Sequence, residues 1–300
     1  MRNVRVIILA VLSLAIILVS MPAWAANVTI GQYATVLNND EMGFRLEAPP
    51  NVSDKPLLVK AEAADSSKIV PVDGIYVTRA VQVSMVNNAA GWTASSLAKP
   101  ARMVFTFNDI DYQRASNMDA GQPVGRFRIG YWDESKKDWV QLPSHVFWNG
   151  SNGVVEAETD HASGRYALLW SYKEDAQISS VVPEGIRIMV DLVPIKSDVA
   201  PYVKDDRTMV PLRVIAENLG ARVDWIGSEN RIDLVRNLEK VSLWVGKTEA
   251  KKGQQSMFMD VAPEVVNERT FVPLRFVSEA FGAKVTWDEI TQTAKVFKNQ

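Results

Sequence analysis

The chain has 300 residues, with 33 Lys and Arg against 35 Asp and Glu, and a formal net charge of −2. Because neither half of the chain is basic, nucleic acid and anionic lipid are poor candidates for partners. Cysteine is absent, which excludes disulfides, thiol catalysis and a lipid-bearing cysteine.

The N-terminus has the pattern of a secretory signal peptide. Two arginines precede an apolar run over 6–19, and Pro22 leads into the Ala23-Trp24-Ala25 segment. Small residues at both recognition positions predict cleavage after Ala25. An uncleaved anchor is the alternative, since the run approaches the length of a membrane span. We favour cleavage and expect a secreted or cell-surface protein with no later transmembrane segment.

Residues 26–175 predict an antiparallel β-sandwich. Short runs with period two are separated by Gly, Asn, Asp and Pro, and no long stretch has helical spacing. These runs lie at 75–77, 81–83, 103–107, 127–131, 154–157 and 166–170. The clearest hairpin is 131–141, with its turn at 133–138. The segment 126–170, which includes YWDESKKDWVQLPS and ETDHASGRYALL, loosely resembles the ZU5-like sandwich ends of bacterial surface proteins and implies no activity.

Aromatic side chains gather around this hairpin and form a candidate binding surface. Trp132, Trp139 and Trp148 could stack on sugars or on a protein partner if they are exposed together. Ordinary packing is the alternative, because strand alternation places Tyr131 and Trp132 on opposite faces of the sheet.

Residues 176–185 are polar, include Pro183 and Gly185, and predict a linker. A duplicated unit follows within 186–300. DRTMVPLRVIAENLGARVDW at 206–225 and ERTFVPLRFVSEAFGAKVTW at 268–287 are 62 residues apart and identical at 11 of 20 positions. Such self-similarity indicates a repeated structural unit.

Each repeat predicts a short helix followed by strands. Pro211 and Pro273 suit a helix start, and Gly220 and Gly282 suit a helix end. The apolar positions between them share one helical face, namely Leu212, Ile215, Ala216 and Leu219, with Leu274, Val277, Ser278 and Phe281 in the second copy. Alternation then predicts strands, so the fold expected for 186–300 is α+β, with strands around two short helices and one core shared by both repeats.

An arginine and a glutamate four residues apart occur in both helices, as Arg213 and Glu217, then as Arg275 and Glu279. Arg before Glu is the weaker order for a helical ion pair. We therefore expect the arginines to make tertiary contacts with strand carbonyls or carboxylates. A catalytic arginine is the disfavoured alternative, because no nucleophile and base accompany it.

The doubled signature RTMVPLR…E-x-x-G-A-x-V-x-W is similar to the copper amine oxidase N-terminal domain, or stalk domain, of exported proteins in Gram-positive bacteria. The resemblance covers 186–297. Its signature positions are Arg207, Pro211, Arg213, Glu217, Gly220 and Trp225, then Arg269, Pro273, Arg275, Glu279, Gly282 and Trp287. It implies a small α+β module that lies outside the active site of the enzyme naming the family, and it supplies no catalytic residue.

The residues favour neither a metal site nor a cofactor. The only histidines, His145 and His161, cannot supply the three imidazoles of a copper amine oxidase site, and a turn histidine is the simpler interpretation of His161. Asp109 and Asp111 predict a solvated turn rather than a Ca²⁺ loop. No nucleophile elbow, zinc-protease motif or phosphate loop occurs.

These features predict a non-enzymatic, exported cell-envelope protein in which a stalk-like module supports or displays the sandwich. The alternative is a module that binds wall polysaccharide or an envelope protein. A wall-polymer hydrolase is the third possibility.

Overall fold

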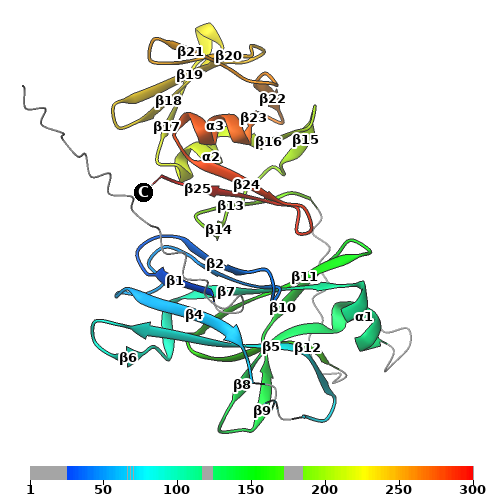
Figure 1. Ribbon diagram of the computed structural model, residues 1–300. Coiled ribbons are helices and arrows are strands. Elements are labelled where there is room, and N and C mark those ends of the chain that lie inside the picture. The colour runs from blue at the N-terminus through cyan, green and yellow to red at the C-terminus, as the bar shows by residue number, and fades with distance from the viewer. Residues whose placement is uncertain are drawn as a thin grey trace, which may run out of the picture.

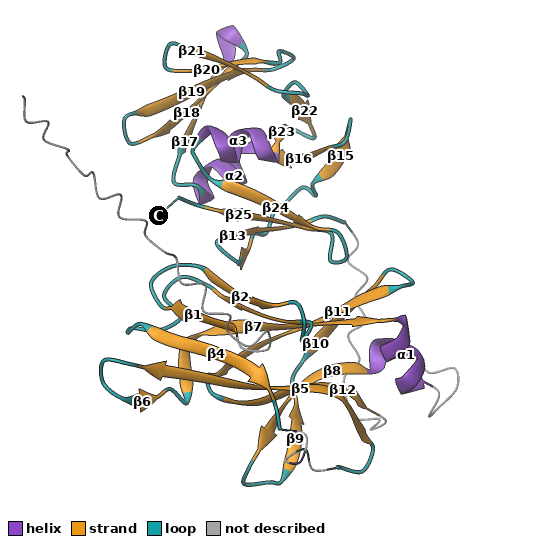
Figure 2. Ribbon diagram, in the orientation of Figure 1, coloured by secondary structure: helices purple, strands orange, loops and turns teal. Residues whose placement is uncertain are grey.

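The computed structural model describes residues 26–65, 67, 69, 71–116, 124–171 and 185–299. The predicted signal peptide, and the predicted linker up to residue 184, lie outside these residues. Two hydrophobic cores, within 30–170 and 188–296, define two domains that lie one above the other (Figure 1). The described chain is mainly β with three short α-helices, which confirms the predicted fold class (Figure 2). None of those helices has the length and hydropathy to cross a bilayer.

The N-terminal domain is an antiparallel β-sandwich of two sheets. Sheet A has the order β1-β4-β5-β12-β8-β9, with β6 beside β5, and sheet B has the order β10-β11-β7-β3-β2. The strands are β1 (Ala26–Ile30), β2 (Thr35–Asn39), β3 (Phe44–Ala48), β4 (Leu57–Ala63), β5 (Ile75–Asn87), β6 (Trp92–Thr93), β7 (Ser96–Asn108), β8 (Phe127–Asp133), β9 (Asp138–Gln141), β10 (Ser144–Trp148), β11 (Asn152–His161) and β12 (Gly164–Ser171). Alternate residues of both sheets fill the core between them, as period-two strands require.

A helix that the sequence did not predict follows β7. The stretch expected to be a solvated turn is instead the start of α1 (Asp109–Ser116). Asp111 accepts a hydrogen bond of 2.7 Å from Arg79 on β5, and acidic residues suit the first turn of a helix. Because Ile110 is exposed and only Ala115 is a fully buried apolar residue of this helix, α1 has no amphipathic pattern for sequence reasoning to detect.

The C-terminal domain contains three small sheets around two helices. Its elements are β13 (Arg187–Val190), β14 (Val193–Pro194), β15 (Tyr202–Lys204), β16 (Arg207–Pro211), α2 (Leu212–Asn218), β17 (Arg222–Ile226), β18 (Arg231–Arg236), β19 (Glu239–Trp244), β20 (Glu249–Lys252), β21 (Gln255–Phe258), β22 (Glu264–Val266), β23 (Arg269–Pro273), α3 (Leu274–Ala280), β24 (Lys284–Asp288) and β25 (Thr293–Phe297). Sheet C has the order β14-β13-β25-β24, sheet D β15-β16-β23-β22, and sheet E β17-β18-β19-β20-β21. Sheets C and D each combine strands from the two ends of the domain, so the repeats are interlocked.

The two repeats meet about an approximate two-fold axis. Val210 on β16 pairs with Val272 on β23, and these residues are equivalent positions 62 apart. Arg207 binds Asp260 at 2.6 Å, and its equivalent, Arg269, binds Asp198 at 2.7 Å. Each repeat therefore supplies the arginine for the other repeat's aspartate, and one core contains apolar side chains from both.

The predicted helical faces are buried, and both terminal glycines have positive φ, +82° at Gly220 and +75° at Gly282. The expected tertiary role of the helix arginines is wrong. Arg213 and Arg275 are exposed, and Arg275 lies 4.0 Å from Glu279 of its own helix. Both side chains project outward from the helix, whereas the strand arginines Arg207 and Arg269 make the contacts between repeats.

Candidate functional site

The outer face of sheet B carries charged residues in a row across three neighbouring strands. Glu47 on β3 pairs in register with Arg102 on β7, which pairs with Glu158 on β11. In the next row, Val104 on β7 lies beside Glu156 on β11. Alternation places all of these side chains on the face opposite the sandwich core. A row of charges is typical of a solvated face, yet several of these residues are buried.

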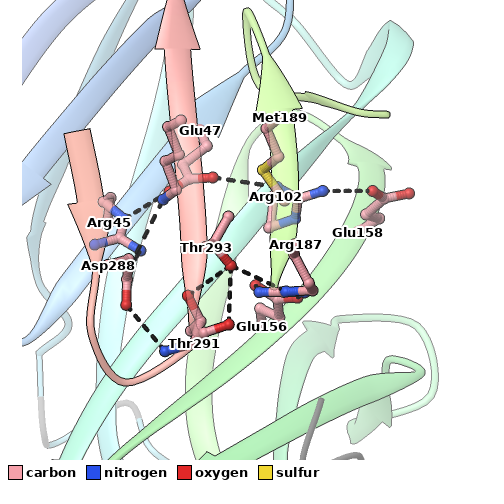
Figure 3. Close-up of polar contacts among 11 residues, drawn as sticks. Arg45, Glu47, Arg102, Glu156, Glu158, Arg187, Met189, Asp288, Thr291 and Thr293 are labelled. Carbon is pink, nitrogen blue, oxygen red and sulfur yellow. Dashed lines mark hydrogen bonds and ion pairs between the residues drawn. The ribbon is translucent and has the colours of Figure 1, made fainter. Parts of the chain in front are cut away.

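The C-terminal domain covers this face with sheet C. Its outward residues are Arg187 and Met189 on β13, Thr293 and Lys295 on β25, and Asp288 on β24, and their backbone neighbours belong to the C-terminal core. The two sheets therefore pack face to face with polar side chains between them (Figure 3). We call this contact the domain interface.

Glu47 is the centre of the domain interface. Its residue is 1% exposed, and three cations surround its carboxylate. Arg45 Nε lies 2.8 Å from Oε1, Arg102 donates to Oε2 at 3.2 Å, and Lys295 of the other domain donates to Oε1. A buried carboxylate is stable only with such compensation, because burial removes the water that would solvate it.

The surrounding charges also determine how Glu47 titrates. Burial by itself would raise the pKa of Glu47, but the charge and hydrogen bond of Lys295 together with the charges of Arg45 and Arg102 outweigh burial, so the pKa is lowered. The pKa of Asp288 is also lowered, since a backbone hydrogen bond from Thr291 and the charges of Arg45 and Lys295 outweigh its burial. Both carboxyl groups are thus ionised when the domains are docked.

A second group of contacts lies beside the first. Arg187 donates to Glu156 Oε1 at 2.6 Å and to Thr293 Oγ1 at 3.0 Å. Its guanidinium lies 4.5 Å from the ring centroid of Phe147, within the range of a cation–π contact. Arg102 further donates to the sulfur of Met189 at 3.1 Å and to Glu158 at 3.1 Å. Four cations and four carboxylates of the two domains therefore balance in charge.

An apolar contact completes the domain interface. Ile290, in the turn between β24 and β25, packs against Val104, Phe147 and Val154 of sheet B. Those three residues are buried although they lie on the outer face of their sheet. Because the Arg187 guanidinium lies over the ring of Phe147, this apolar contact adjoins the charged contacts directly.

A cleft of about 620 Å³ opens where the domains meet, and it is lined by residues of both. Arg102, His145, Glu156 and Glu158 line it from the sandwich, and the opposite wall is largely apolar, with Ile186, Ile188 and Pro194 among its residues. The cleft has the size of a small-molecule site. Its carboxylates are bound by Arg102 and Arg187. Over the described ranges, no three His, Asp or Glu side chains are grouped to hold a metal ion.

The sequence of the covering domain matches a known family. Residues 189–296 match the copper amine oxidase N-terminal domain. This finding confirms the resemblance inferred from the doubled signature, and it supports a non-catalytic, accessory role for the C-terminal domain. The comparison with curated proteins finds no match for the chain.

The predicted aromatic binding surface is wrong. Trp132 and Trp139 are 6% and 3% exposed and form a T-shaped pair with ring centroids 5.4 Å apart. Trp148 stacks on Phe107 at 5.3 Å and packs against the sandwich core. Large aromatic rings stabilise a fold mainly through burial. All three tryptophans therefore pack against neighbouring side chains and do not form a shared exposed surface.

The two histidines lie apart from one another. His145 is exposed on β10 at the cleft. His161 packs on Tyr131 with centroids 4.1 Å apart, and its backbone carbonyl accepts a 2.7 Å hydrogen bond from the Tyr166 hydroxyl. This geometry gives His161 a structural role in the β11–β12 turn.

The residues of the domain interface were not identified from the sequence. The sequence did contain an indication of this interface. Val104 and Val154 are apolar, yet they alternate with residues of the same strands that already face the sandwich core. Apolar residues on both faces of a strand indicate that both faces are covered. The partners of Glu47 were not accessible to such reasoning, because Lys295 is 248 positions away.

Proposed function

We propose that this protein is a non-enzymatic component of the cell envelope, in which the copper amine oxidase N-terminal-like domain holds the β-sandwich in a fixed orientation. The observation that carries this proposal is the burial of Glu47 among Lys295, Arg102 and Arg45 at the domain interface. A flexible tether needs no such contact. A buried, charge-balanced contact fixes orientation, because any displacement leaves a charge unpaired.

The chemistry of the cleft supports a non-enzymatic role. Glu156 and Glu158 are each bound by an arginine, so both carboxylates already have a partner in the folded protein. His145 is exposed, and His161 is used in a turn. Wall-polymer hydrolysis would need two carboxyl groups with distinct roles on either side of a bound sugar, and these carboxylates serve the domain interface instead.

Export and an envelope location are part of this proposal. They rest on the basic, then apolar, then Ala-x-Ala pattern of residues 1–25, and on the similarity of the C-terminal domain to a module of exported proteins. Fractionation of cells that express the full chain tests the location. We expect a product shortened at Ala25 in the envelope or the medium; a full-length product in the cytoplasm would contradict export.

A separate assay tests the non-enzymatic role. The purified chain is incubated with wall glycan and wall peptide, and the soluble products are separated by mass. We expect no products above a buffer control. Turnover that is lost on replacing Glu158 with Gln would overturn the proposal, since Glu158 is the more exposed carboxylate of the cleft.

A further inference from the structure

A second groove, of about 630 Å³, lies within the C-terminal domain. It runs between helix α2, strands β17 and β18, and the β22–β23 hairpin. Val223, Trp225, Ile232 and Val265 form its apolar surface, and Arg213, Glu217 and Glu268 are among its polar residues. All of these polar residues are exposed, so the groove combines an apolar surface with solvated hydrogen-bonding groups.

Trp225 is the principal aromatic side chain of this groove. It is 50% exposed, although it lies on a strand where a large ring would normally be covered. A Cβ atom at Gly227 would lie 3.3 Å from Trp225 Nε1. The edge of the indole therefore rests on the backbone at Gly227, where a side chain would crowd it. The ring is thus supported on one side and open to solvent on another.

The second repeat carries part of the same set of residues: Ile232 and Gly227 correspond to Ala294 and Glu289, and Trp287 Nε1 donates a 2.6 Å hydrogen bond to Glu289. Trp287 is 40% exposed, and Val203, the equivalent of Val265, is also exposed. Arg275 and Glu279 project from α3 as Arg213 and Glu217 project from α2. Neither helix packing nor the 4.0 Å pair of Arg275 and Glu279 explains why exposed residues recur in both copies. Recurrence of the exposed tryptophan, valine, arginine and glutamate indicates a surface property that both repeats share.

We propose that the groove at Trp225 binds a carbohydrate chain, with the indole face against a sugar ring. An exposed indole offers a flat apolar surface that fits the C–H face of a pyranose. The planar guanidinium of Arg213 and the carboxylate of Glu217 can donate to and accept from neighbouring hydroxyls. The lining has three acidic and two basic residues, Asp198, Glu217 and Glu268 against Arg213 and Arg269. This near balance disfavours strongly charged polymers and suits an uncharged, hydroxyl-rich ligand.

The repeated set extends the proposal to a second contact at Trp287. Two binding positions on one rigid domain would favour long chains over short ones, because the second contact becomes intramolecular. The groove lies wholly within the C-terminal domain and shares no charged contact with the domain interface. Carbohydrate binding and the fixed display of the sandwich can therefore fail independently.

Calorimetric titration of the chain from residue 26 to 300 tests the proposal. The probes are β-1,4-linked oligomers of N-acetylglucosamine and of glucose, each with two, four and six sugars. We expect saturable binding of at least one series, with affinity rising with length. Trp225→Ala should weaken binding by about tenfold, which corresponds to the loss of one aromatic contact, and Trp287→Ala should weaken binding of the hexamer.

The matched control is Trp92→Ala. Trp92 is 38% exposed but lies on β6 of the sandwich, so its loss should leave binding unchanged. Circular dichroism confirms that each variant is folded. Absence of saturable binding to all six oligomers, or equal affinity of Trp225→Ala and the unmodified chain, would each overturn the proposal.

Discussion

Lys295 donates a hydrogen bond to Glu47 although the two residues are 248 positions apart. Lys295 lies on β25, the last strand of the C-terminal domain, and Glu47 lies on β3, the third strand of the sandwich. Because the bond joins the two domains, it makes their relative orientation part of the folded state.

Replacing Glu47 with Gln removes the negative charge and keeps the shape of the side chain. Arg45, Arg102 and Lys295 would then lie together without the carboxylate that they surround. Removing one partner of a buried ion pair typically costs about 3 to 5 kcal/mol, and we expect the free energy of unfolding to fall by that order. Equilibrium unfolding in urea measures it.

The control for this variant is Glu134→Gln. Glu134 pairs with Lys137 at 2.9 Å, but both side chains are mostly exposed. Exposed ion pairs contribute little, so we expect no clear change in stability. Equal effects of the two variants would show that the burial of Glu47 has no energetic consequence.

The domain interface should loosen in acid. The pKa values of Glu47 and Asp288 are lowered from their ordinary values of 4.5 and 3.8. The undocked or unfolded state therefore takes up protons first as the pH falls through this range, and stability is lost progressively below about pH 5. At neutral pH both carboxyl groups are ionised in either state, so their full contribution to stability is present. Stability measured from pH 7 to pH 3 tests this expectation, and Glu47→Gln combined with Asp288→Asn should flatten the curve.

Ile290→Asp should separate the domains without unfolding either one. The aspartate would lie against the apolar side chains of Val104, Phe147 and Val154, which offer no hydrogen bond to a buried charge. We expect a larger radius of gyration in small-angle X-ray scattering, with unchanged circular dichroism. Val193→Asp is the control, because Val193 is exposed on β14. A compact Ile290→Asp variant would show that the apolar contact is dispensable.

Leu274→Ala should destabilise both repeats together. Leu274 is fully buried in a core that also contains Leu212 and Ile215 of the first repeat. Truncation of a buried leucine costs about 2 to 5 kcal/mol. Hydrogen exchange should show faster opening in β18 as well as in β25. Full protection of the first repeat, with opening confined to the second, would mean that the repeats unfold separately.

Local patterns predicted the elements of this fold but not its contacts. The helical faces at Leu212 and Leu274, the glycines that end both helices and the 131–141 hairpin follow from short-range periodicity. Helix α1 was missed because its few apolar residues do not recur at the three- to four-residue spacing of an amphipathic helix. Its position depends on Arg79, which is 32 residues away.

The candidate sites required information that one sequence does not contain. Trp132 and Trp139 are buried against each other, and their burial depends on how sheet A is covered rather than on local pattern. Glu47, within FRLEA of β3, has the spacing of a solvent-facing residue. Only the second domain, which docks on that face, buries it.

The most direct test of the account measures the distance between the domains. The chain has no cysteine, so spin labels can be placed at Lys60→Cys on β4 and Lys251→Cys on β20, both of which are exposed. Double electron–electron resonance at pH 7 should give one narrow distance distribution, which broadens in the Ile290→Asp variant. A distribution that is already broad in the otherwise unmodified chain, and is unchanged by Ile290→Asp, would contradict the claim that the C-terminal domain holds the sandwich in a fixed orientation.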